Sequence, residues 1–96
     1  MKAGTHVVVT TEKRGVFGGV IQSGSIESTV VTLSQARMCF YWSAPTKGVL
    51  GLAAIGPQDG SRVTAAIPSI ELNGVTAIME ATPTAVAKWE EEAWAP

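Results

Sequence analysis

The sequence contains few of the side chains on which many protein functions depend. Cys39 is the only cysteine and His6 is the only histidine. A single cysteine cannot form an intrachain disulfide or a cysteine-rich metal site, and a histidine-based zinc site would need ligands from several subunits. A Ser–His–Asp triad has the residue types it needs, but their spacing gives it no support. We therefore expect no metal and no cofactor, and the chain is predicted not to be an enzyme.

Charged residues are also scarce, at 16% of the chain, and the formal net charge is −1. An average globular chain has roughly 25% charged residues. The seven lysines and arginines are spread along the sequence and form no basic run. This distribution argues against a protein that binds DNA or RNA through the phosphate backbone. It leaves room for a small anionic ligand, which needs only two or three well-placed cations.

Long apolar runs are missing as well. No stretch approaches the ~20 apolar residues of a membrane-spanning helix, and the first residues, MKAGTHVVVTTEKR, lack the apolar core of a signal peptide. The expectation is a soluble intracellular protein with no membrane partner. Hydrophobic residues nonetheless make up 46% of the chain, and a domain of this size has a small interior. We expect part of the apolar surface to be buried in a homo-oligomer; a monomer with an apolar surface is the alternative.

Length and pattern together predict one domain over residues 1–96, of the α+β class and mainly antiparallel sheet, with about five to six short strands. The first half of the chain is rich in β-branched and aromatic residues, interrupted by glycine-containing turns such as 23–25. These signals predict four consecutive strands, at 5–11, 16–23, 28–34 and 37–42. Short connections between them favour an antiparallel meander.

Two short helices are predicted. The first, over 46–55, comes after the fourth strand, and the second, over 83–93, is C-terminal. Thr82 and Pro83 suit the N-cap and the first position of the second helix. Trp94 is expected to dock on its own domain or on a neighbouring subunit. The apolar face of the first helix is assigned to Val49, Leu50, Ala53 and Ala54.

Between the two helices the chain returns to extended structure. Residues 61–72 are interrupted by Pro68, which cannot donate a ladder hydrogen bond and therefore indicates a sheet edge or a connection. Asn73-Gly74 is a turn signal. A last strand is predicted over 75–81.

The run RMCFYWS, residues 37–43, holds three of the six aromatic residues of the chain. Side chains alternate between the two faces of a strand, which places Met38, Phe40 and Trp42 on one face. We interpret Met38 and Phe40 as core and Trp42 as either core or the wall of a pocket. The opposite face then carries Arg37, Cys39 and Tyr41.

Arg37 and Tyr41 suit a flat anionic ligand. The tyrosine ring can stack on a base, and the guanidinium can hold a phosphate through paired charged hydrogen bonds. Ser43 and Thr46 add hydroxyl groups at the predicted helix start, where free backbone N–H groups also favour an anion.

A purely structural interpretation stays open beside the ligand site. Adjacent aromatics are common in strands, a strand can be buried on both faces, and Arg37 can pair with Glu27 or Glu80. Arg14 and Phe17, in and after the first turn, are further candidates for a ligand site. A solvated hairpin turn is their alternative.

Motifs across nearly the whole chain resemble a group of small phage-encoded proteins. Members of the group have an R-G-V-F-x-G turn, an A-R-R-x-x-Y-W-S-G-like motif, a short helix ending in A-x-x-G, a proline-containing segment, a terminal strand and a late tryptophan. Met38 and Ala44 stand where the group has its second arginine and its glycine, so one expected cation is missing. Y-W-S is the most specific part of the match. The matching pieces are 14–19, 36–37, 41–43, 53–56, 68, 75–80 and 94.

This group is similar to the phage anti-CBASS sponge proteins. CBASS is bacterial antiphage signalling through cyclic oligonucleotides, and a sponge binds the nucleotide without cleaving it. The resemblance implies a homo-oligomer, with a tetramer favoured, that holds a cyclic dinucleotide such as 3′,3′-cGAMP between subunits. It places the protein in the cytoplasm of an infected bacterial host. The residues assigned to ligand binding are Arg14, Phe17, Arg37, Tyr41, Trp42, Ser43 and Thr46.

Two other functions compete with the sponge. The first is a protein-binding phage accessory factor, which would inhibit a host protein or serve in virion assembly. The aromatic row would then be an interface hot spot. The second is a nucleotide-degrading phosphodiesterase, which the lack of a metal cluster and the single histidine disfavour.

Overall fold

The computed structural model describes residues 2–12, 15–25, 27 and 29–91. Over these residues it confirms the α+β class, with an antiparallel six-stranded sheet and two α-helices. Arg14 and Trp94 lie outside the described residues. In chain order the elements are β1 (His6–Thr11), β2 (Val16–Ser25), β3 (Val30–Tyr41), the 3-10 helix η1 (Ala44–Thr46), α1 (Gly48–Ala54), β4 (Arg62–Val63), β5 (Ile67–Leu72), β6 (Val75–Glu80) and α2 (Pro83–Glu91).

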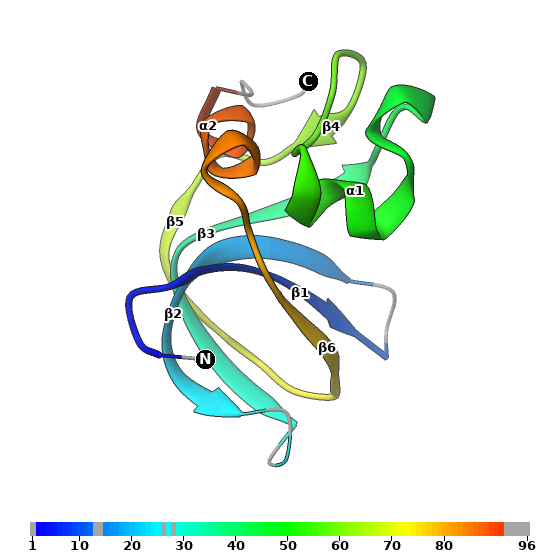
Figure 1. Cartoon of the computed structure of the whole chain (residues 1–96). Helices are drawn as coiled ribbons and strands as arrows, with labels where there is room; N and C mark the ends of the chain where they lie inside the picture. The colour runs from blue at the N-terminus through cyan, green and yellow to red at the C-terminus, as the bar shows by residue number, and fades with distance from the viewer. Residues whose placement is uncertain (1, 13–14, 26, 28, 92–96) are drawn as a thin grey trace.

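The sheet curls on itself. Its strand order is β4-β3-β2-β1-β6, and β5 also pairs with β3, along the part of β3 that precedes its pairing with β4. The strands β5 and β6 are thus at opposite ends of the pairing order, yet only Asn73 and Gly74 separate them in the chain. The sheet must bend until these two ends approach each other. Figure 1 shows the curled strands below, with both helices and β4 gathered above them.

Two hydrophobic clusters fill the molecule, one on each face of the sheet. The three consecutive valines of β1, Val7, Val8 and Val9, are fully buried because both faces of this strand are covered. Val7 and Val9 belong to the cluster inside the curl, together with Ile21, Val31, Leu33, Ala36, Leu72 and Val75. Val8 belongs to the cluster under the helices, together with Val16, Cys39, Leu52, Ala53, Val63, Ala81, Ala85 and Trp89.

The predicted third and fourth strands, 28–34 and 37–42, are one strand, β3. The expected break is replaced by a bulge at Gln35, whose φ is +51°. Val20 of β2 pairs with Ser34 and Gly18 pairs with Arg37, so β3 carries one residue more than β2 across this step. The first helix therefore follows the third strand and not the fourth, although it lies where the sequence placed it along the chain.

The bulge also exchanges the faces of β3. Val31 and Leu33 point into the curl, and after the extra residue Ala36 does so as well. Cys39 consequently points to the helices, and the odd-numbered side chains, including Arg37, leave the interior of the curl. A one-residue shift turns every later side chain to the opposite face.

The first helix, α1, is shorter than the predicted 46–55, and its buried face differs from the expected one. Gly51, Leu52 and Ala53 are buried, whereas Leu50 is 73% exposed and Ala54 is also exposed. The cause lies at Gly51, because a Cβ atom there would collide with the carbonyl oxygen of Thr46. Residue 51 therefore turns inward, and Leu50 turns to the surface.

The second helix begins as predicted. The hydroxyl of Thr82 accepts a hydrogen bond from the backbone N–H of Ala85 at 3.1 Å, which is the geometry of an N-cap. The same hydroxyl donates to the carbonyl oxygen of Ala54 at 2.8 Å and so joins the end of α1 to the start of α2.

The remaining predicted strands are present with shifted limits. Pro68 lies in β5, which pairs with β3 alone among the described strands, so the edge position is confirmed. The predicted turn at 23–25 is wrong, because these residues continue β2 and pair with β3. Within the described part of the chain, no helix has the length and apolar character needed to cross a membrane.

Candidate functional site

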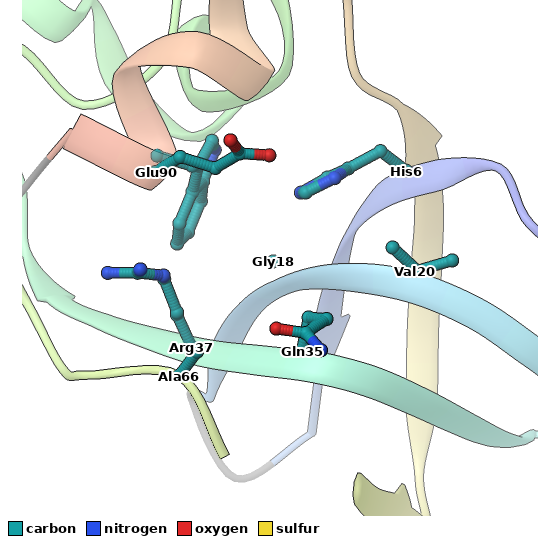
Figure 2. A pocket seen from close by; sticks show the side chains of 8 residues that line it. His6, Gly18, Val20, Gln35, Arg37, Ala66 and Glu90 are labelled. Atoms are coloured by element: carbon teal, nitrogen blue, oxygen red, sulfur yellow. The ribbon is translucent and has the colours of Figure 1, made fainter. Parts of the chain in front are cut away.

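A polar pocket of about 430 Å³ lies between the strands β1 to β3 and the last turn of α2. Figure 2 shows the side chains around it: the Glu90 carboxylate points toward His6, whereas the Arg37 guanidinium points away from His6. Glu90, Gln35 and Ala66 are exposed, so the pocket opens to solvent, whereas Gly18 and Trp89 are buried. Its complete lining is His6, Gly18, Val20, Gln35, Arg37, Ala66, Trp89 and Glu90.

The buried wall of the polar pocket depends on the contact between Gly18 and Trp89. A Cβ atom on Gly18 would lie 2.9 Å from two atoms of the Trp89 ring, which is too close. The missing side chain therefore allows α2 to lie directly on β2. The indole Nε1 donates to the carbonyl oxygen of Leu52 at 2.9 Å, which fixes the ring from its other end. Glu90, the next residue, is thereby held at the rim of the pocket.

The bulge in β3 supplies another part of the lining. Gln35 and Arg37 are two residues apart and share the face that the bulge directs away from the curl. Without the extra residue, Arg37 would point toward the interior cluster. The guanidinium reaches this pocket because of a local feature of the strand.

Three ionisable side chains meet here: His6 from β1, Arg37 from β3 and Glu90 from α2. The pKa of the His6 imidazole is lowered from its ordinary value of 6.5, and burial is the main cause. The Glu90 carboxylate acts in the raising direction, and the Arg37 guanidinium adds to the lowering. The pocket thus presents a cation, an anion and an imidazole that is mostly neutral at pH 7.

A second feature, the aromatic patch, lies at the end of β3 and comprises Phe40, Tyr41, Gly60 and Arg62. Phe40 is 48% exposed and Tyr41 is 53% exposed, so the prediction that Phe40 belongs to the core is wrong. The reason is that, of the strands the structure describes, the two-residue β4 is the one that accompanies this end of β3, and it pairs Arg62 with Tyr41. The patch surrounds a shallow hollow of about 470 Å³.

Ser43 and Thr46 form a third feature, a buried hydroxyl cluster with Ser61. The three hydroxyl oxygens lie 3.3–3.4 Å from one another. Thr46 is fully buried and accepts a hydrogen bond from the backbone N–H of Gln58 at 3.0 Å. Ser43 donates to the Gln58 carbonyl oxygen at 3.3 Å. These hydroxyls hold the segment between β3 and β4 together and do not line either of the two features above.

The predicted site residues are therefore spread over several features. Among the described residues, Arg37 shares an apolar groove with Phe17, and Ser43 lies beside Thr46. Arg37 lines the polar pocket and Tyr41 belongs to the aromatic patch. Trp42 is partly buried against the cluster under the helices. Phe17 packs against the cluster inside the curl and, with Met38, lines an apolar groove of about 180 Å³.

Arg62, His6 and Glu90 are among the residues of these features that sequence reasoning missed. Arg62 could have been found, because antiparallel pairing after the turn at 56–60 brings 62 back to the end of the preceding strand. His6 and Glu90 lie near opposite ends of the sequence and carry no shared motif. Only the docking of α2 on β2 brings them together.

Among the described residues there is no group of three or more His, Cys, Asp or Glu side chains that could hold a metal ion. The features of the site are instead charged, aromatic and hydrogen-bonding side chains. Such an arrangement can bind and orient a ligand through stacking and charged hydrogen bonds.

Comparison with known proteins gives one match. A search of curated proteins and a search of solved structures found no match to the chain. A family model described as "Domain of unknown function (DUF6948)" matches residues 4–89. Because this match spans all the strands and nearly all of α2, the chain belongs to the DUF6948 domain family.

Proposed function

We propose that the protein binds and sequesters a cyclic dinucleotide without cleaving it, and so inhibits CBASS signalling in the cytoplasm of an infected bacterial host. The observation that supports this best is the aromatic patch. Two aromatic side chains, Phe40 and Tyr41, stand about half exposed beside Arg62. Exposed aromatic faces are costly to leave in water and are what a nucleobase stacks on.

The chemistry of the patch matches the parts of a nucleotide. Tyr41 offers a ring face to a base, and Arg62 offers a fork of N–H donors to a phosphate. Arg62 is paired with Tyr41 across the β3–β4 ladder, so the backbone places the two side chains next to each other. A stacking interaction of this kind contributes about 1–3 kcal/mol per base.

The surface also supports binding between subunits. Among the described residues, the exposed large hydrophobic side chains are Phe40, Tyr41, Leu50 and Ile67. Contiguous exposed apolar patches mark interaction sites, and Phe40 and Tyr41 are adjacent in the chain. A homo-oligomer, with a tetramer favoured, would place aromatic patches from different subunits against the two faces of one ligand.

The test is a binding titration of cyclic di- and trinucleotides against the parent and two variants. Tyr41→Ala should weaken binding by about 1–3 kcal/mol through the lost stack, and Arg62→Ala should weaken it through the lost phosphate contact. Thr84→Ala is the control, since it removes an exposed neutral side chain of α2 outside the patch. The bound ligand should be recovered intact after heating. Equal affinity of Tyr41→Ala and the parent for every nucleotide would contradict the proposal.

A protein-binding accessory factor is the second candidate, and the same exposed aromatics favour it. Aromatic and arginine side chains dominate interface hot spots, and the aromatic patch contains both kinds. In that case no nucleotide stabilises the protein, and a host protein co-purifies with the parent but not with Tyr41→Ala.

A further inference from the structure

We propose that the polar pocket receives a guanine base, with Arg37 at the edge that carries O6 and N7 and Glu90 at the edge that carries the N1 and N2 hydrogens. The inference deepens the proposed function and rests on it, because guanine would be one base of the bound cyclic dinucleotide. It concerns a different set of residues from the aromatic patch, since the two share no lining residue.

The argument begins with donors and acceptors. An arginine fork matches the adjacent O6 and N7 acceptors of guanine and is the commonest side chain used to read them. A carboxylate accepts hydrogen bonds and donates none, so it fits the neighbouring N1–H and N2–H₂ donors. Arg37 and Glu90 come from β3 and α2 and approach the pocket from different walls (Figure 2). Guanine is the base that presents acceptors on one edge and donors on the next.

The same chemistry disfavours adenine and a bare phosphate. Adenine places an unprotonated ring nitrogen, an acceptor, where guanine has N1–H, and Glu90 would then face an acceptor with a carboxylate. A phosphate would suit Arg37 alone, but the Glu90 carboxylate would repel it. The opposed charges of the pocket therefore indicate a neutral group with both donors and acceptors.

The other lining residues are consistent with a base that is recognised by hydrogen bonds to its edges and not by stacking on its faces. Trp89 is only 1% exposed, so its ring is a wall and not a stacking surface. Gln35 has an amide that can both donate and accept. Because its pKa is lowered, His6 is mostly uncharged at pH 7 and adds one donor and one acceptor without a second positive charge. The volume, about 430 Å³, is within the range of small-molecule sites.

Arg37 can serve a base while keeping contacts within the protein. Its guanidinium has five N–H donors, and a two-donor contact with O6 and N7 leaves three for other partners. Replacing it with lysine retains the charge but removes the fork. Arg37→Lys therefore separates base reading from simple charge attraction.

The experiment compares guanine and adenine ligands in matched pairs: GMP against AMP, and cyclic di-GMP against cyclic di-AMP. The parent should prefer the guanine member by roughly 5- to 150-fold, the discrimination of one good two-bond contact. Glu90→Gln should remove this preference, because the lost carboxylate weakens guanine binding and the new amide donor strengthens adenine binding, and Arg37→Lys should reduce it. Glu91→Gln is the matched control, because Glu91 is the next residue of α2 and does not line the pocket. Unchanged melting temperatures identify the variants as folded.

The outcomes separate this inference from the proposed function. If both cyclic dinucleotides bind equally, or if Glu90→Gln keeps the guanine preference, the guanine site is wrong and sequestration stands. If GMP binds over AMP but no cyclic dinucleotide binds, the guanine site stands and sequestration is wrong. If none of the four ligands binds, the guanine site is wrong, and binding of another cyclic nucleotide then decides sequestration.

Discussion

Gly18 shows how a single missing side chain determines the geometry of the polar pocket. Its Cα atom forms the surface on which the Trp89 ring lies. Because Trp89 belongs to α2, this contact fixes the position of the helix, and the helix places Glu90 at the rim of the pocket. The position of a charged group on one element thus depends on a residue of another element that has no functional group of its own.

Gly18→Ala should destabilise the protein by about 1–3 kcal/mol, because the added methyl group overpacks the contact with Trp89. The free energy of unfolding, measured by urea titration, gives the cost. Trp89→Phe and the double variant complete a double-mutant cycle. If the clash is the cause, the double variant will be less destabilised than the sum of the two single variants. Additive costs would show that the glycine acts in some other way.

At the scale of elements, the strands were easier to predict than their faces. The valine run of β1 and the apolar alternation of β6 identify both strands from sequence alone. The bulge at Gln35 was missed because glutamine is not a residue that indicates a positive φ. A weaker signal was present: the interior residues Val31 and Leu33 are two apart, whereas Leu33 and Ala36 are three apart.

The site was less predictable than the fold, because its residues come from elements that are distant in the sequence. Arg37 was found because its residue type suggested a ligand, but its neighbours in space come from β1 and α2. Those neighbours are set by packing, and packing between distant elements leaves no periodic pattern in the sequence. Ser43 and Thr46 have the residue types of a binding site and are instead buried.

The hydroxyl cluster determines the conformation of the segment between β3 and β4. Thr46→Val keeps the shape of the side chain but removes the acceptor for the Gln58 N–H. A buried donor without a partner costs about 1–3 kcal/mol, and the free energy of unfolding should fall by that amount. Thr76→Val is the control, because Thr76 bonds Thr10 on an exposed surface and should cost much less. Unchanged stability with weaker ligand binding would show instead that the Thr46 hydroxyl contacts ligand.

At the scale of the whole molecule, His6 couples stability to pH. It is half-buried, it is the only histidine of the chain, and Glu90 and Arg37 are the charged groups that act on it. Since burial lowers its pKa in the folded state, the unfolded state binds the proton more tightly. The contribution of His6 to stability is therefore fully present above the unfolded pKa of 6.5. It is lost as the pH falls through 6.5 toward the lower pKa of the folded state.

The prediction is that the free energy of unfolding falls between pH 7.5 and about pH 5.5 in the parent, and falls less in His6→Gln. Chemical denaturation at several pH values measures both curves. The range lies above the ordinary pKa of carboxylates, so the difference between the two curves reports His6. Parallel curves would show that the imidazole does not become harder to protonate on folding.

The pairing of β1 with β6 has a consequence for synthesis of the protein on the ribosome. Val9 pairs with Phe17 soon after both are made, but its partner on the other side, Ile78, is translated much later. At roughly 5–20 residues per second, this delay lasts several seconds. During that time one edge of a valine-rich strand has no partner and is free to pair with the same edge of a nascent chain on the same messenger RNA. The time needed to translate the segment between β1 and β6 therefore determines how long this misassembly competes with folding.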